Sequence, residues 1–287
     1  MSESVFGGTR AALEKRRRPL IAGILNVTPD SFSDGGRFAS PGAAVDAALR
    51  MADEGADLID LGAVSTRPGA APVSEEEERR RLLPVLEGLA GRLHRPLSID
   101  TYRASILEEA VDRGAGILND VTALRGDPRM AGTAARLGVG VILMHMQGNP
   151  LTMQKEPHYE DVVREVRSFL AERLEAAEAA GIAPEALVVD PGIGFGKDLR
   201  HNLDLLRGLG ELRKLGRPIM LGASRKSFLG KLLERVDPAE REWGTAAVTA
   251  HAFCEGVELV RVHDVRAAHD LSRVLEEIRR PSERPET

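Results

Sequence analysis

The stretch of the chain best suited to chemistry runs from Asp190 to Lys197 and reads Asp-Pro-Gly-Ile-Gly-Phe-Gly-Lys. It follows the apolar run Ala186 to Val189, which is typical of a buried strand. A carboxylate there, followed by proline and three alternating glycines, contributes little to a core, and glycine lets a backbone approach a ligand closely. We therefore predict that Asp190 binds a neutral heterocycle rich in hydrogen-bond donors. A tight strand-to-helix turn is the alternative interpretation.

This motif differs from the loops that bind nucleotides. The Walker pattern places four residues between a glycine and Gly-Lys-Ser/Thr, whereas position 191 here is proline and position 198 is aspartate. The dinucleotide fingerprint has its third glycine at another position.

Two residues near the C-terminus predict an anion site. Val257 to His263 reads as a strand, and Arg261 and His263 share one face of it because strand side chains alternate. A structural pair with Asp264 is the alternative. Asn26, at the end of the first predicted strand, can bring an amide oxygen to a Mg²⁺ ion that bridges phosphate oxygens, since Mg²⁺ uses few protein ligands and keeps water. A diphosphate leaving group fits this arrangement.

A second anion site is predicted at Gly222 to Ser227, where Gly-Ala-Ser-Arg-Lys-Ser stands at the start of a predicted helix. Backbone N–H groups of a first helical turn and the Ser227 hydroxyl can bind a carboxylate. Lys226 can lean inward to a carbonyl group. A surface lysine is the alternative interpretation of that residue.

The remaining candidates supply carboxylates and an amide rather than a metal site. Asp100 and Asn119 end two further predicted strands and complement Asp190. The histidines lack the paired spacing of zinc ligands, and no glutamates form the opposed pairs that glycosidases use. We expect His145 to be packed or hydrogen-bonded rather than catalytic. These residues together predict a central heterocycle, a diphosphate beside it and an outer anion.

Short apolar runs separated by helical patterns occur eight times along the chain. Such runs are typical of strands in a parallel sheet that is covered on both faces. Eight strands alternating with eight helices predict an α/β fold, the (β/α)8 TIM barrel with eight parallel strands. Two doubly wound domains are the alternative, but no shift in composition divides the chain. The predicted strands span residues 20–25, 57–62, 96–100, 115–119, 138–144, 186–190, 218–223 and 257–263.

Polar residues stand at the C-terminal end of strand after strand. In a barrel these ends converge on one mouth, where active sites of this fold lie. The residues are Asn26, Asp60, Asp100, Asn119 with Asp120, His145, Asp190, Ser224, and Arg261 with His263.

Long loops are predicted after strands 1, 2 and 5, at residues 27–38, 63–73 and 145–158. Phe32 and Phe38 lie in glycine-flanked parts of the first loop, which are poor core positions. We expect these loops to act as mobile lids that exclude water from a reactive intermediate.

The bulk composition indicates one large globular domain. Of 287 residues, 43% are apolar and 29% charged, and we divide the chain into a polar lead at 1–18, a single barrel domain at 19–280 and a flexible tail at 281–287. A net charge of −5 disfavours nucleic-acid binding. The longest apolar run, Val139 to Met144, is far shorter than the roughly 18 residues of a membrane span. With Cys254 as the single cysteine and no signal-length apolar segment, the chain reads as cytoplasmic.

At these residues the chain resembles the dihydropteroate synthase family, and the resemblance covers nearly its whole length. Eight separated segments match in the same order, which is far more specific than any one motif. The resemblance implies a barrel, usually homodimeric, that joins 6-hydroxymethyl-7,8-dihydropterin diphosphate to 4-aminobenzoate and releases pyrophosphate in folate synthesis. The matching segments span residues 24–36, 65–70, 98–101, 117–121, 144–150, 190–197, 224–227 and 261–265.

The resemblance also implies a dissociative displacement, in which the diphosphate leaves, the cation is delocalised into the pterin and the arylamine attacks. Ser227 would bind the aminobenzoate carboxylate. Phe195 and Thr66 would also contact substrate, and Asp34, Arg67 and Lys226 would be the catalytic residues, with Asp34 near the cation. The loop residues that would close over the site are Phe32, Asp34, Thr66, Arg67 and Pro68. The residues that would hold the pterin are Asp100, Asn119, Asp190 and Lys226. The diphosphate would be held by Arg261, His263 and Asn26, with Asn26 as the ligand of Mg²⁺.

One position departs from the family pattern. Val64 stands where the family commonly has the glutamate of Gly-Gly-Glu-Ser-Thr-Arg-Pro-Gly. A non-catalytic pterin-binding paralogue is therefore one alternative. A methyltransferase that passes a methyl group from methyltetrahydrofolate to a corrinoid protein is another, but it needs neither a diphosphate site nor the Ser-Arg-Lys-Ser sequence.

Overall fold

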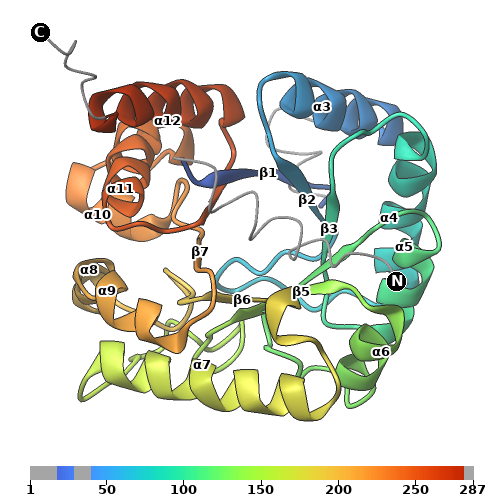
Figure 1. The fold of residues 1–287 in the computed structure, drawn as a ribbon, viewed down its shortest axis with the longest axis horizontal. Coiled ribbons are helices and arrows are strands. Elements are labelled where there is room, and N and C mark those ends of the chain that lie inside the picture. The colour runs from blue at the N-terminus through green and yellow to red at the C-terminus, as the bar shows by residue number, and fades with distance from the viewer. Residues whose placement is uncertain (1–17, 29–39, 281–287) are drawn as a thin grey trace, which may run out of the picture.

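The chain forms a ring of eight parallel strands surrounded by helices, which confirms the predicted barrel (Figure 1). The computed structural model describes residues 18–28 and 40–280. Neighbouring strands follow the order β6-β5-β4-β3-β2-β1-β8-β7, so the alternative of two doubly wound domains is wrong. The strands are β1 (Leu20–Asn26), β2 (Leu58–Gly62), β3 (Leu97–Asp100), β4 (Ile117–Asp120), β5 (Gly140–Met144), β6 (Leu187–Asp190), β7 (Met220–Leu221) and β8 (Leu259–Val262).

The ring is closed between β6 and β7 by a single bridge. Val189 pairs with Ile219, and the Val189 amide donates a hydrogen bond to the Pro218 carbonyl at 3.0 Å. The strand predicted at 218–223 is therefore too long. Its last residues leave the sheet because the chain turns at Arg225, which has a left-handed φ of 59°.

Helices cover the outside of the ring, and side chains cap the starts of five of them. Each capping oxygen accepts a hydrogen bond from the backbone amide three residues on, which satisfies a group that the helix leaves unpaired and contributes about 1 kcal/mol. The capping residues are Ser40, Ser74, Asp161, Asp198 and Asp264. The helices are α3 (Pro41–Asp53), α4 (Glu75–Leu89), α5 (Ala104–Val111), α6 (Met130–Leu137), α7 (Val162–Ala179), α8 (Leu199–Arg207), α9 (Leu209–Leu212), α10 (Ser227–Leu233), α11 (Glu242–Cys254) and α12 (Val265–Arg279), with short 3₁₀ helices η1 (Pro184–Ala186), η2 (Arg213–Leu215) and η3 (Pro238–Arg241).

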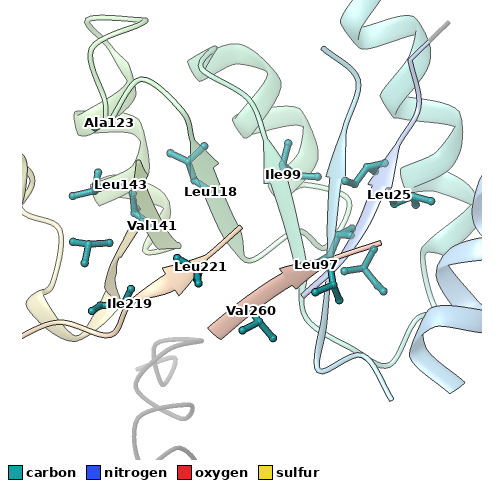
Figure 2. Close-up of a cluster of buried hydrophobic side chains, with 14 of the residues drawn as sticks. Leu25, Leu97, Ile99, Leu118, Ala123, Val141, Leu143, Ile219, Leu221 and Val260 are labelled. Carbon is teal, nitrogen blue, oxygen red and sulfur yellow. The ribbon is translucent and has the colours of Figure 1, made fainter. Parts of the chain in front are cut away.

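The buried apolar residues of the described ranges form two clusters separated by strand alternation and a third, smaller cluster of Val121, Met144, Met146 and Met153. The larger cluster contains alternate strand residues packed with the helices, and Figure 2 shows part of it, including Leu25, Ile99, Leu118 and Leu143. The other strand residues form a separate cluster, which we call the inner core. Its members come from seven of the eight strands: Leu20, Ala22, Leu58, Ile117, Ile142, Val188, Met220 and Leu259.

The candidate site residues continue the inner core along the same strands. Because side chains two positions apart share a face, each of four inner-core residues is followed on that face by a polar residue. The sequence thus places the candidate site directly on top of the inner core, toward the C-terminal ends of the strands. The four pairs are Leu58 and Asp60, Ile117 and Asn119, Val188 and Asp190, and Leu259 and Arg261.

Some predictions fall outside the described residues. These are the lead at 1–17, the tail at 281–287, and Phe32, Asp34 and Phe38 of the first loop. Arg18 is described, and its guanidinium donates to the Asp57 carboxylate at 2.8 Å, just before β2. In the two described ranges, no helix combines the length and apolar character that crossing a membrane requires.

Candidate active site

Asp60 is the centre of a buried hydrogen-bond network above the inner core. Its Oδ1 accepts from the Ser98 hydroxyl at 2.6 Å, and its Oδ2 accepts from Asn119 Nδ2 at 3.1 Å and from Arg261 Nε at 2.5 Å. Arg261 Nη2 also donates to Asp100 Oδ2 at 3.2 Å. Residues from β2, β3, β4 and β8 therefore meet at one place, as the barrel predicted.

Asn119 presents a buried acceptor to this site. Because its Nδ2 donates to Asp60, the orientation of the amide is fixed, and its Oδ1 faces away from the carboxylate. Within the described residues this buried oxygen has no hydrogen-bond partner. A buried acceptor without a partner is costly, so the site favours a ligand that brings an N–H or O–H donor to it.

Asp190 ends β6 and is buried, as predicted. Its Oδ1 accepts from the Gly192 amide at 2.7 Å. Burial raises the pKa of Asp190, and the nearby Lys226 ammonium and the Gly192 N–H oppose that rise. Asp190 is thus a desolvated acceptor on the opposite side of the barrel from Asp60.

The glycines of the 190–197 motif bring two backbone segments together. A Cβ on Gly192 would lie 1.9 Å from the His145 carbonyl oxygen, and a Cβ on Gly196 would lie 2.5 Å from that of Gln147. Both glycines also have left-handed φ values. The close approach of these glycines to a ligand stays a prediction, and within the protein they closely approach the loop that follows β5. The motif is therefore more than a tight turn, because it joins two loops of the mouth.

Lys226 leans inward, as predicted, so the interpretation as a surface lysine is wrong. Its Nζ donates to the Ile193 carbonyl and lies 4.1 Å from the centroid of the Phe195 ring. Burial lowers the pKa of Lys226 to about 7, although the carboxylates of Asp190 and Asp100 act in the opposite direction. The next residue, Ser227, begins α10 and is exposed.

Arg261 lies between two carboxylates. Its guanidinium binds Asp60 and Asp100, so its charge is already shared with protein groups. Burial raises the pKa of Asp100, helped by Asp60 and opposed by Arg261. The alternative pairing with Asp264 is wrong, because the Asp264 carboxylate caps α12 by accepting from the Ala267 amide.

His263 is oriented by Ser224. The Ser224 Oγ accepts from the His263 amide at 3.2 Å and lies 2.9 Å from the His263 Nδ1. These two contacts fix the direction of the imidazole ring, whose Nδ1 faces the Ser224 hydroxyl.

Asp120, which neighbours Asn119, serves another purpose. Its carboxylate accepts from the backbone amides of Thr122 and Leu124 and from the Thr122 hydroxyl. These contacts fold the loop after β4, and strand alternation directs Asp120 away from Asn119. Of the two polar residues that end β4, only Asn119 belongs to the site network.

The loop after β2 is held at both ends even though Val64 replaces the expected glutamate. Arg81 donates to the Ala63 carbonyl at 2.9 Å, and Arg103, paired with the buried Glu78, donates to the Val73 carbonyl. In the middle of the loop, the Gly69 amide donates to the Pro150 carbonyl at 3.0 Å. This last contact joins the loops after β2 and β5.

Thr66 and Arg67 belong to that loop, where Thr66 is half-buried and Arg67 exposed.

Asn26 ends β1 beside Gly62, and a Cβ on Gly62 would lie 3.6 Å from Asn26 Oδ1 and 3.2 Å from the Asp100 Cβ. The glycine thus leaves room for both side chains at the mouth. Within the described ranges, no three His, Cys, Asp or Glu side chains group as a metal site.

Sequence reasoning gave no role to two residues that organise the site. Asp60 was recognised only as a polar residue at a strand end, although its position two residues after Leu58 marks it as inward-facing. Lys197 was recognised only as the last residue of a motif. It is buried, and its Nζ lies 2.9 Å from His145 Nδ1, which no sequence pattern predicts.

Known proteins resemble this chain over most of its length. The pterin-binding enzyme family matches residues 22–263. The dihydropteroate synthase of Escherichia coli (strain K12) is 47% identical over 258 residues, which is 90% of this chain and 91% of that protein. The dihydropteroate synthase of Synechocystis sp. is 45% identical over 258 residues, covering 90% of this chain and 89% of that protein.

Solved structures agree with these relatives. Yersinia pestis dihydropteroate synthase, in complex with a sulfonamide drug, superposes with a TM-score of 0.87 at 45% identity and covers 91% of this chain and 94% of its own. Xanthomonas albilineans dihydropteroate synthase with 4-aminobenzoic acid gives a TM-score of 0.86 at 48% identity, with 92% and 94% coverage. The same enzyme with 7,8-dihydropteroate gives 0.83 at 45% identity, with 92% and 95% coverage. The chain belongs to the dihydropteroate synthase family of pterin-binding enzymes.

Proposed function

We propose that the protein is a dihydropteroate synthase, a transferase that condenses 6-hydroxymethyl-7,8-dihydropterin diphosphate with 4-aminobenzoate to 7,8-dihydropteroate and pyrophosphate. Its relatives of this identity carry that name. The Xanthomonas albilineans structures contain 4-aminobenzoic acid in one case and 7,8-dihydropteroate in another, which are the second substrate and the product of this reaction.

The observation that carries the proposal is the set of buried acceptors above the inner core. Asn119 Oδ1 has no partner within the described residues, and the carboxyls of Asp190 and Asp100 are desolvated. A dihydropterin carries an amino group and ring N–H groups along its edge, and these donors match such acceptors. A ligand without them would leave buried groups unpaired, which makes this site selective. We assign Lys226 to the pterin as a donor.

We assign the diphosphate to Arg261, His263 and Asn26. Arg261 is fixed by two carboxylates, and the His263 ring is oriented by Ser224. Asn26 offers a single amide oxygen, which suits Mg²⁺ because this ion takes one or two protein ligands and completes its shell with water and substrate phosphates. Bound there, Mg²⁺ would neutralise negative charge on the departing diphosphate.

In the second step of the reaction, the protein has only to position the arylamine beside the pterin. Once the diphosphate has left, the pterin cation reacts with the arylamine directly, so no protein nucleophile is needed. We assign Phe195 and Ser227 to the aminobenzoate, with its carboxylate at Ser227. Thr66 and Arg67 lie on a loop anchored at both ends, and we propose that they close over the site with Asp34 to exclude water.

Pyrophosphate release from the two substrates with Mg²⁺ tests this function. We expect release that depends on both substrates, together with formation of 7,8-dihydropteroate. Tight pterin binding without release would instead identify a non-catalytic paralogue. Methyl transfer from methyltetrahydrofolate to a corrinoid protein would identify the methyltransferase.

We also propose that the protein is a cytoplasmic homodimer with neither nucleic-acid nor membrane partners. The support is a set of exposed apolar side chains on α11, on α12 and between α10 and η3, elements that are in contact along the chain. Val236, just before η3, is 91% exposed, Trp243 of α11 is 87% exposed, and Val274 and Ile278 of α12 are exposed as well. Light scattering after gel filtration should give the mass of two chains, and Trp243→Glu should reduce it to one.

A further inference from the structure

The 193–196 segment of the motif is held by side chains at every carbonyl group. An irregular loop lacks the backbone ladder of a strand or helix, so its buried polar groups need other partners. Here four consecutive carbonyls accept hydrogen bonds from four different side chains. Ile193 accepts from Lys226, Gly194 from Gln154 at 2.6 Å, Phe195 from Lys197 at 2.9 Å and Gly196 from the Tyr159 hydroxyl at 2.8 Å.

Lys197 is the most deeply buried of these donors, with 2% of its surface exposed. Its Nζ lies 2.9 Å from the Phe195 carbonyl oxygen, 2.9 Å from His145 Nδ1 and 3.5 Å from the His145 carbonyl oxygen. These three partners carry no negative charge. A lysine in this position is costly for the fold, because burial penalises its charged form. Such a cost is typical of a residue that serves a site.

His145 is built to accept from Lys197. Its ring packs edge-on against Phe169 at a centroid distance of 4.8 Å, and Tyr159 lies on another side at 6.1 Å. Burial and the neighbouring Lys197 lower the pKa of His145 to about 2, so the imidazole is neutral and its Nδ1 can act as an acceptor. Lys197 therefore links the loop after β5 to the loop after β6.

Phe195 lies between two lysines. Its carbonyl binds Lys197 on the buried side, and its ring lies 4.1 Å from the Lys226 Nζ toward the mouth of the barrel. The cation and the aromatic face attract each other, but this contact needs the ring to be held in one orientation. The ring packs against Met144, Met146 and Met153, and the bond from Lys197 to the Phe195 carbonyl holds the backbone from which the ring projects.

We propose that Lys197 is a positioning residue for the arylamine substrate: through the Phe195 carbonyl and His145, it holds the backbone at residue 195 in the place where the Phe195 ring faces Lys226. This inference rests on the proposed function and on the assignment of Phe195 to 4-aminobenzoate. The groups assigned to the pterin are held by other contacts: Asn119 is oriented by Asp60, Asp190 by the Gly192 amide, and Lys226 keeps its own bond to the Ile193 carbonyl. Loss of the Lys197 bonds should therefore affect the second substrate far more than the first.

Steady-state kinetics of pyrophosphate release, with each substrate varied in turn, test the proposal. Lys197→Met keeps the apolar stem and removes the donor. We expect the KM for 4-aminobenzoate to rise about tenfold and the KM for the pterin diphosphate to stay within about twofold. The matched control is Lys214→Met on the surface, where Lys214 pairs with Glu211, and both KM values should be unchanged.

A double-mutant cycle separates positioning from general support of the loop. If Lys197 acts through the Phe195 ring, adding Lys197→Met to Phe195→Ala should change the KM for 4-aminobenzoate by less than about twofold. Equal rises in both KM values, or additive effects in the double variant, would overturn the proposal. Thermal unfolding of each variant shows whether it is folded.

A milder pair of variants decides the question if Lys197→Met does not fold. His145→Asn keeps an acceptor near the position of Nδ1, whereas His145→Leu removes it. The proposal expects only the leucine variant to raise the KM for 4-aminobenzoate, and equal behaviour of the two would overturn it.

If the wild-type protein releases no pyrophosphate, the proposed function fails. Calorimetric titration of 4-aminobenzoate into the wild type and Lys197→Met then tests the positioning role separately, since equal affinities would contradict it.

Discussion

The inner core and the polar network above it occupy the same strands and the same face, two residues apart. Leu58, Ile117, Val188 and Leu259 fill the lower level of the barrel, while Asp60, Asn119, Asp190 and Arg261 form the upper level. The lower level stabilises the fold, because complete burial of a large apolar side chain contributes about 1.5–3 kcal/mol. Position along a strand therefore decides whether an inward residue supports the fold or the chemistry.

The upper level has the opposite energetic character. Burial raises the pKa of Asp190 and of Asp100 and lowers that of Lys226, so each charged form is penalised in the ligand-free protein. The buried oxygen of Asn119 adds an unpaired acceptor within the described residues. A ligand with matching donors relieves these penalties. The comparison predicts that substitutions in the lower level reduce the free energy of unfolding, whereas substitutions in the upper level reduce the affinity for the ligand.

The largest effect should come from the inner core. Ile142 is fully buried there, and Ile142→Ala should lower the free energy of unfolding by about 2–5 kcal/mol because it leaves a cavity. Urea denaturation measures this loss. Pterin affinity, measured on the folded protein, should be unchanged, and a parallel loss of affinity would contradict the separation of the two levels.

Asp190→Ala should reverse this pattern. We expect pterin affinity to fall by about a hundredfold or more, since a buried acceptor for the ligand is lost. The free energy of unfolding should stay the same or increase, because a desolvated carboxyl has been removed. Calorimetric titration and urea denaturation of the same variant decide, and retained pterin affinity would show that Asp190 is not an acceptor for this ligand.

Arg261→Ala should act mainly on the diphosphate. We expect the affinity for the pterin diphosphate to fall about tenfold more than the affinity for the pterin without its diphosphate. Titration of both ligands into the variant measures the difference. Equal losses would show that Arg261 serves only to hold Asp60 and Asp100 in place.

A pH dependence of stability should come from Lys226. Its pKa is lowered to about 7 in the folded protein from an ordinary value of 10.5, so between these two pH values the unfolded chain binds more protons at this residue. The contribution of Lys226 to stability should therefore increase as the pH rises from about 7 to about 10.5. Urea denaturation of the wild type and Lys226→Met across this range checks the sign. A wild-type advantage that shrinks with rising pH would contradict the burial of this lysine.

Most of the fold could be predicted from the sequence because strand length and periodicity are local properties. The strand boundaries agree within a few residues, except at β7, where the turn at Arg225 ends the strand early. The convergence of Asp100, Asn119 and Arg261 followed from the barrel itself. Helix starts at Ser74 and Asp161 are likewise set by capping side chains.

The contacts between side chains could not be predicted in the same way. Which carboxylate binds Arg261, and whether Lys197 points into the protein or toward solvent, depends on residues that are far apart in sequence. The glycines at 192 and 196 gave a correct signal of close packing, but the sequence did not reveal that the neighbour is the loop after β5. Three-dimensional packing, rather than local propensity, decides these points.

The single bridge between β6 and β7 determines where the ring is easiest to widen. Elsewhere neighbouring strands share two to five residue pairs, whereas Val189 and Ile219 form the sole pair at this seam. Asp190 follows one of these residues directly, and Lys226 follows the other after a short turn. A small separation of the two strands would therefore change the spacing between the carboxylate and the ammonium group while most of the backbone pairing around the barrel stays intact.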